Sequence, residues 1–199
     1  MDYKKMLKLH GLVGIIVSFF FLSTSAFAGG MIKGKIDYKK KRWIRDTFVY
    51  LENVPDKWEP QEAEMNQVGS TFIPKYLPII VGSTVKFLNS DPTEHNVYSP
   101  DHETFNLGKA NQGEVLSHTF NKVGGYTQLC KLHAAMIAFV VVLPNPYYGQ
   151  SDKKGVFVIK DVPPGHYRLI TWNQRYKADH VEVDVKDGES VEVTIKLHR

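Results

Sequence analysis

The chain has 199 residues, a formal net charge of +4, eight histidines and a single cysteine, Cys130. Three lysines and one aspartate fall within residues 1–28, so the rest of the chain carries a charge of only about +2, which gives no reason to expect a nucleic-acid partner. A lone cysteine cannot form a disulfide within the chain, and an exposed free thiol in an oxidising compartment is a liability.

Residues 1–28 have the order of a secretory signal peptide: a lysine-bearing start, an apolar run over 11–22, and a small-x-small end at Ala26-Phe27-Ala28. The apolar run is short for a membrane span, although an uncleaved N-terminal anchor is the alternative. In a bacterial cell this predicts a periplasmic protein that begins near Gly29 and has no transmembrane segment after signal removal.

The remaining sequence predicts many short strands separated by turns, and no long stretch has helical periodicity. The apolar run 138–143 is typical of a strand buried on both faces. This pattern predicts an all-β sandwich fold. Strands are expected at 32–37, 47–52, 85–88, 115–120, 126–129, 138–143 and 181–185, and turns at 89–92, 124–125, 163–165 and 187–188.

Two connections, 55–64 and 144–155, flank a central block, which predicts a domain over 61–143. The segment before this block offers only two strands, which are too few for a stable domain. We therefore expect residues 29–60 and 144–199 to form one smaller, discontinuous sandwich into which the central domain is inserted.

The chemistry-bearing motif is Cys130-Lys131-Leu132-His133-Ala134-Ala135-Met136, which places a thiolate, an imidazole and a thioether within seven residues. A turn upstream leads into His95, which can supply a second imidazole from a neighbouring strand. Two histidines, one cysteine and a weak axial methionine are the ligand set of electron-transfer copper. The motif therefore predicts one type 1 copper per chain, held by His95, Cys130, His133 and Met136. The alternative is a buried free cysteine beside a core methionine.

These residues resemble the cupredoxins, and the Cys-x2-His-x2-Met spacing is most similar to the amicyanin branch. The resemblance implies an eight-stranded Greek-key sandwich with copper at one end, and it implies that Asn96 helps to fix the ligand strands near the thiolate. Where the family often has prolines around the second histidine, this chain has Leu132 and Ala134, a departure that bears on loop rigidity and redox potential. The resemblance is carried by 82–89, 95–97, 120–125 and the four ligand positions.

The outer segments resemble a carboxypeptidase regulatory-like, or transthyretin-like, domain. The signature is the strand, Pro-Gly turn and strand over 155–169. The whole arrangement is similar to proteins of the methylamine-utilisation or plastocyanin-like type, a resemblance from which amine metabolism does not follow.

A basic run over 39–42, together with Arg45, has two interpretations. The first is a solvated hairpin turn. The second is a docking patch for an acidic redox partner, since opposite charges raise encounter rates.

The sequence thus predicts an exported one-electron carrier, not an enzyme, that exchanges electrons with a redox protein such as a c-type cytochrome or an oxidoreductase. The oligomeric state stays open. The alternatives are a periplasmic copper chaperone or storage protein, a binding module with a redundant copper site, and an enzyme that uses Cys130 as nucleophile with His133 as base. A closed ligand set with no open position favours the carrier.

Overall fold

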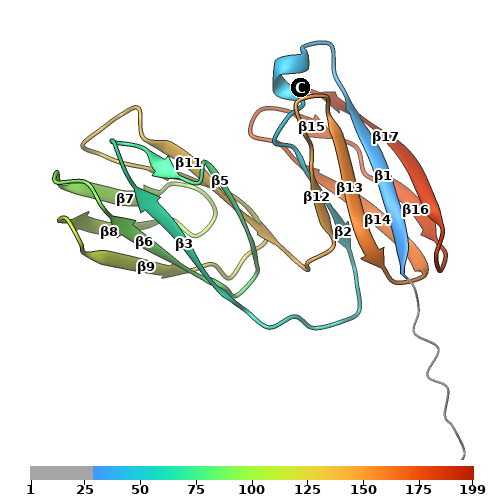
Figure 1. Cartoon of the computed structure of the whole chain (residues 1–199), viewed down its shortest axis with the longest axis horizontal. Helices are drawn as coiled ribbons and strands as arrows, with labels where there is room; N and C mark the ends of the chain where they lie inside the picture. Colours follow the sequence, from blue (N-terminus) through green and yellow to red (C-terminus); the bar gives the residue numbers. More distant parts are fainter. Residues whose placement is uncertain (1–28) are drawn as a thin grey trace, which may run out of the picture.

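The computed structural model describes residues 29–199, so the predicted signal peptide lies outside the described residues. These residues form seventeen strands in four sheets and one short 3-10 turn, which confirms the all-β fold class (Figure 1). Within 29–199, no helix has the length and hydropathy that a membrane crossing requires.

The strands from both ends of the described chain build the outer sandwich, whose sheets have the orders β13-β1-β17-β15 and β12-β2-β14-β16. β1 alternates buried and exposed residues, as a strand with one face on a core does. It pairs in parallel with β17 and antiparallel with β13. The strands are β1 (Gly30–Asp37), β2 (Phe48–Glu52), β12 (Tyr148–Gln150), β13 (Val156–Val162), β14 (Gly165–Trp172), β15 (Lys177–Ala178), β16 (Val181–Val185) and β17 (Ser190–His198).

The basic run after β1 does not form a hairpin, so that prediction is wrong. β1 and β2 belong to opposite sheets, and the segment between them, which contains the 3-10 turn η1 (Lys41–Trp43), crosses from one sheet to the other. Two strands that follow each other in the sequence form a hairpin only when each has an unpaired edge. Here β1 has none, because β13 pairs with one of its edges and β17 with the other.

The strands between residues 62 and 143 build the central sandwich, with sheet orders β5-β11-β10-β7-β8 and β4-β3-β6-β9. It has nine strands where the resemblance implied eight, because the two-residue β4 adds to the edge of β3. The large side chains Phe87, Phe120 and Tyr126 fill its core. The strands are β3 (Glu62–Gln67), β4 (Phe72–Ile73), β5 (Tyr76–Ile80), β6 (Thr84–Asn89), β7 (His95–Ser99), β8 (Phe105–Ala110), β9 (Val115–Thr119), β10 (Gly124–Leu129) and β11 (Ile137–Leu143).

β11 carries the continuous apolar run, and two cores divide its side chains between them. Val140 and Val142 point into the central sandwich. Val141 and Leu143 pack on Phe48 of β2, where the two sandwiches meet. Burial on both faces explains why this strand does not alternate polar and apolar residues.

The turn expected at Gly124 and Gly125 is wrong, because β10 begins at Gly124. A Cβ atom on Gly125 would lie 2.0 Å from Nε1 of Trp172, which belongs to β14 of the outer sandwich. The missing side chain thus makes room for an indole at the junction of the sandwiches, and the glycine pair marks this close approach instead of a turn.

Candidate metal centre

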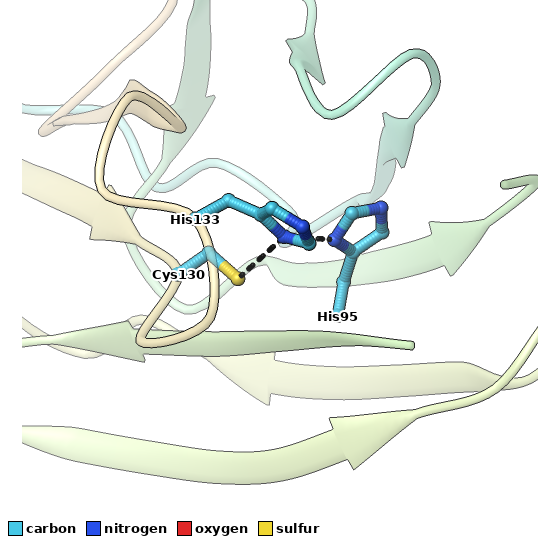
Figure 2. A group of neighbouring side chains, drawn as sticks. All are labelled: His95, Cys130 and His133. Atoms are coloured by element: carbon cyan, nitrogen blue, oxygen red, sulfur yellow. Dashed lines mark hydrogen bonds between the residues drawn. The ribbon is translucent and has the colours of Figure 1, made fainter. Parts of the chain in front are cut away.

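Three of the four predicted ligand residues come together at one end of the central sandwich (Figure 2). Cys130 and His133 lie in the loop that joins β10 to β11, and His95 is the first residue of β7. β7 and β10 are antiparallel neighbours, paired at Tyr98 and Leu129, so the loop that follows Leu129 runs alongside β7 toward its first residue. The sheet pairing therefore delivers a histidine that lies 35 residues before the cysteine in sequence.

The ligand atoms face one another closely. Nδ1 of His95 lies 3.1 Å from Nδ1 of His133. Nδ1 of His133 lies 3.9 Å from Sγ of Cys130. The three atoms all lie within 4.8 Å of one another. His95 is fully buried, Cys130 is 4% exposed and His133 is half-buried.

These separations fit a single soft or borderline metal ion. Metal bonds of about 2.0 Å to nitrogen and about 2.3 Å to sulfur allow two ligand nitrogens up to about 4.0 Å apart, and a nitrogen and a sulfur up to about 4.3 Å apart. The two shorter separations satisfy these limits as they stand. The remaining pair, His95 and Cys130, needs a movement of at most about 0.5 Å to come within the nitrogen–sulfur limit. His95, Cys130 and His133 can therefore hold a metal ion.

Met136 lies at the end of the same loop and is 1% exposed. It packs in the core cluster that also contains Cys130. Its backbone N–H donates to the carbonyl of His133 at 3.0 Å, which turns the loop back toward β11. Its role as an axial ligand stays a prediction.

Asp91 fixes the orientation of His95. Its Oδ2 lies 2.7 Å from Nε2 of His95, and its carboxylate also accepts the backbone N–H groups of Gly69 at 2.6 Å and Ser70 at 2.8 Å. The bond from Ser70, followed by that from His95, holds the pKa of Asp91 below its ordinary value. A carboxylate at Nε2 places the proton there and leaves Nδ1 free to bind a metal.

Sequence reasoning treated Asp91 only as part of a turn and missed this contact. A signal was present, because a carboxylate four residues before a candidate histidine ligand is the kind of partner that metal-binding histidines use.

Asn96 ties the thiolate loop to the sheet, as the resemblance implied. Its backbone N–H donates to Sγ of Cys130 at 3.4 Å, and its side-chain oxygen accepts the N–H of Lys131 at 3.4 Å. Its side-chain amide donates to the carbonyl of Gly108 at 2.6 Å and to Oδ1 of Asn106 at 2.9 Å. One residue thus links β7, β8 and the ligand loop.

The surface beside the centre is apolar. Leu132 is 45% exposed and Ile137 is 43% exposed, and Ala134 and Ala135 between them are also exposed. His133 is the half-buried member of the ligand group, so these exposed apolar residues stand on both sides, in sequence, of the ligand that comes nearest to solvent.

The fold and these residues define a two-sandwich, all-β protein with a candidate mononuclear His2Cys metal site. No family model and no curated protein matches the chain. The carboxypeptidase regulatory-like assignment of the outer segments therefore stays a prediction.

Solved structures to which the chain is similar include a purple cupredoxin, a copper-containing nitrite reductase and mutants of amicyanin. A purple cupredoxin from Nitrosopumilus maritimus is 29% identical over 41% of this chain and 99% of its own, with a TM-score of 0.38. A copper-containing nitrite reductase from Thermus scotoductus SA-01 is 32% identical over 47% of this chain and only 25% of its own, with a TM-score of 0.40. A mutant of amicyanin in its reduced state is 25% identical over 40% of this chain and 80% of its own, with a TM-score of 0.38. At these TM-scores the similarities carry no argument, and the functional reasoning rests on the site residues.

Proposed function

We propose that the protein is a type 1 copper protein that carries one electron at a time. The observation that carries the proposal is the convergence of two imidazole nitrogens and one thiol sulfur within 4.8 Å, at the end of a β-sandwich, with Met136 buried in the adjoining core. Two histidines, one cysteine and a weak thioether are the ligand set of electron-transfer copper.

Copper bound at this site would supply a one-electron couple between Cu(I) and Cu(II). The residues of the chain set the conditions for that couple. The Cys130 sulfur favours Cu(I), whereas the imidazoles of His95 and His133 accept both oxidation states. The N–H of Asn96 withdraws electron density from the sulfur, and Asp91 keeps His95 in place, so the ligands need little rearrangement.

The burial of the ligands supports a carrier over a chaperone. His95 is fully buried and Cys130 is nearly so, whereas a chaperone needs ligands that a partner can reach. With Met136 as the fourth ligand, the metal would have no free position for substrate, which favours a carrier over an enzyme.

We propose that electrons are exchanged through the apolar residues beside His133, and the exposure pattern supports this route. His133 is the half-buried ligand, and the exposed Leu132 and Ile137 flank it in sequence. We further propose export to the periplasm and a redox protein, such as a c-type cytochrome or an oxidoreductase, as the partner. The signal-like pattern of residues 1–28 supports export, and the one-electron chemistry of the ligand set supports a redox partner.

The test is titration of the protein from Gly29 onward with Cu(II), followed by visible absorption and electron paramagnetic resonance. We expect one equivalent to bind with an intense thiolate-to-copper band, which Cys130→Ser and His133→Ala abolish. His102→Ala is the matched control, because His102 is exposed and lies outside the cluster, and it retains the band. A wild-type protein that stays colourless with Cu(II), or that yields Cu(I) readily to a chelator, contradicts the carrier and favours the chaperone.

Met136 needs a separate test, because a weak axial ligand changes the potential more than the colour. We expect Met136→Leu to keep the absorption band and to change the reduction potential. Met65→Leu, in the same core and equally buried, is the control and leaves the potential unchanged. Equal potentials in the two variants would remove Met136 from the ligand set.

A further inference from the structure

A cavity of about 250 Å³ opens where the two sandwiches meet, away from the ligand loop in sequence. Its walls come from three separate segments: the crossing between β1 and β2, the turn after β14, and the start of β5. The lining residues are Arg42, Trp43, Arg45, Asp46, Lys75, Tyr76 and Gln174.

Cationic groups dominate this junction pocket. Arg42, Arg45 and Lys75 line it and are exposed. Its one carboxylate, Asp46, is already engaged, since it accepts Nε of Arg45 at 2.9 Å and Nε2 of Gln150 at 3.0 Å. Among the ion pairs of residues 29–199, none joins Arg42 or Lys75 to an acid. The pocket therefore holds unneutralised positive charge.

Two exposed arginines are held over the ring of Trp43, which lines the pocket. The guanidinium of Arg42 lies 4.8 Å from the ring centroid of Trp43, and that of Arg175 lies 4.1 Å from the same centroid. Such stacking leaves the in-plane N–H groups of a guanidinium available for a carboxylate.

The backbone of the pocket is fixed by Asn173, which joins two of its walls. Nδ2 of Asn173 donates to the carbonyl of Trp43 at 3.1 Å and to the hydroxyl of Thr47 at 2.7 Å. Its side-chain oxygen accepts the N–H of Arg175 at 3.0 Å. The pocket is therefore organised before anything binds, which lowers the entropic cost of binding.

The wall formed by Lys75 and Tyr76 belongs to the sandwich that carries the metal centre. Tyr76 stacks on Phe139 of β11 with ring centroids 5.3 Å apart and planes at 14°. The carbonyl of Lys75 accepts the N–H of Phe139 at 2.9 Å. A ligand in the pocket thus contacts residues that are bonded to the strand beginning directly after Met136.

We propose that the junction pocket is a docking site for an acidic segment of a partner protein, with carboxylate side chains that pair with Arg42 and Lys75. Two observations favour a protein segment over a free small molecule. The cavity is smaller than the roughly 300–1,000 Å³ typical of small-molecule sites. Its lining combines tryptophan, tyrosine and arginine, the residue types that carry most of the energy at protein interfaces. The inference stands apart from the metal, since no residue of the pocket is a candidate ligand.

The test uses a hexaglutamate peptide as the probe, titrated into the chain from Gly29 onward and followed by tryptophan fluorescence. We expect saturable binding that weakens as salt rises toward about 0.15 M, where the Debye length is about 8 Å. Lys75→Glu should weaken binding at least about tenfold, because a like charge now faces the carboxylates. Trp43→Phe should remove the fluorescence change while calorimetry still detects binding.

The matched control is Lys33→Glu, an identical charge reversal at a position of β1 outside the pocket. It should leave the affinity within about twofold. Equal weakening by Lys33→Glu and Lys75→Glu would show general charge attraction and overturn the site. Citrate binding as tightly as the peptide would overturn the acidic segment as the occupant. Circular dichroism of each variant separates these outcomes from misfolding.

Discussion

Replacing Asp91 with asparagine tests how far one carboxylate controls the metal centre. The substitution preserves the size of the side chain and removes its charge. Asp91 accepts three N–H groups, from His95, Gly69 and Ser70, through two oxygens. Asparagine has one oxygen and one NH2 group, so at least one of these donors must face another donor.

The contacts set the expected magnitude. Partners that orient a metal-binding histidine typically contribute 10- to 100-fold to affinity, so Asp91→Asn should weaken metal binding by about 1.4–2.7 kcal/mol. The metal-free protein should also lose about 1.5–3 kcal/mol of unfolding free energy, the usual value of a hydrogen bond to a charged group. Asp91 is 8% exposed, so solvent replaces little of either contribution.

Two assays separate the effects. Metal affinity is measured by competition with a chelator, and stability by urea unfolding of the metal-free protein. The control is Asp101→Asn, because Asp101 accepts the N–H of Thr127 at 2.7 Å but contacts no candidate ligand. The control should lose stability and retain affinity. Unchanged affinity in Asp91→Asn, with stability reduced, would refute the reasoning and leave Asp91 a purely structural residue of its loop.

Three further predictions concern the rest of the molecule. Gly125→Ala should destabilise the protein by about 1–3 kcal/mol in urea unfolding, because its Cβ would overlap the Trp172 indole, and Trp172→Ala in the same chain should relieve part of that cost. Leu51→Ala, at a fully buried core position of the outer sandwich, should cost about 2–5 kcal/mol in the same assay and leave the metal site intact. The bond from Asp184 raises the pKa of His166, so NMR titration should find His166 protonated above its ordinary range, and Asp184→Asn should lower that pKa.

The sign of the His166 effect follows from which form the fold favours. A pKa that is higher in the folded than in the unfolded state stabilises the protein at pH values below the ordinary pKa of about 6.5. This contribution is lost as the pH rises through the raised pKa. Because both side chains are exposed, the change should appear in the titration curve more clearly than in stability. A Gly125→Ala protein as stable as wild type, a Leu51→Ala protein that loses metal, or a His166 pKa insensitive to Asp184 would each contradict the corresponding argument.

The local features of this protein were readable from its sequence. Short alternating segments predicted strands, and the structure places one at Val181–Val185, as expected. Cys130, His133 and Met136 could be grouped because three metal-binding side chains within seven residues share one loop whatever the surrounding fold. The apolar run of β11 was also readable, since burial on both faces leaves no room for polar residues.

The tertiary structure decided whatever depends on pairing between distant segments. It brought His95 to the ligand loop, placed Asp91 behind it, and put Trp172 against Gly125, where the sequence had suggested a turn. It also combined Lys75 with arginines about 30 residues away in one pocket. Sequence patterns record which face of a strand is buried, but the identity of the neighbour across that face depends on sheet order, which long-range packing sets.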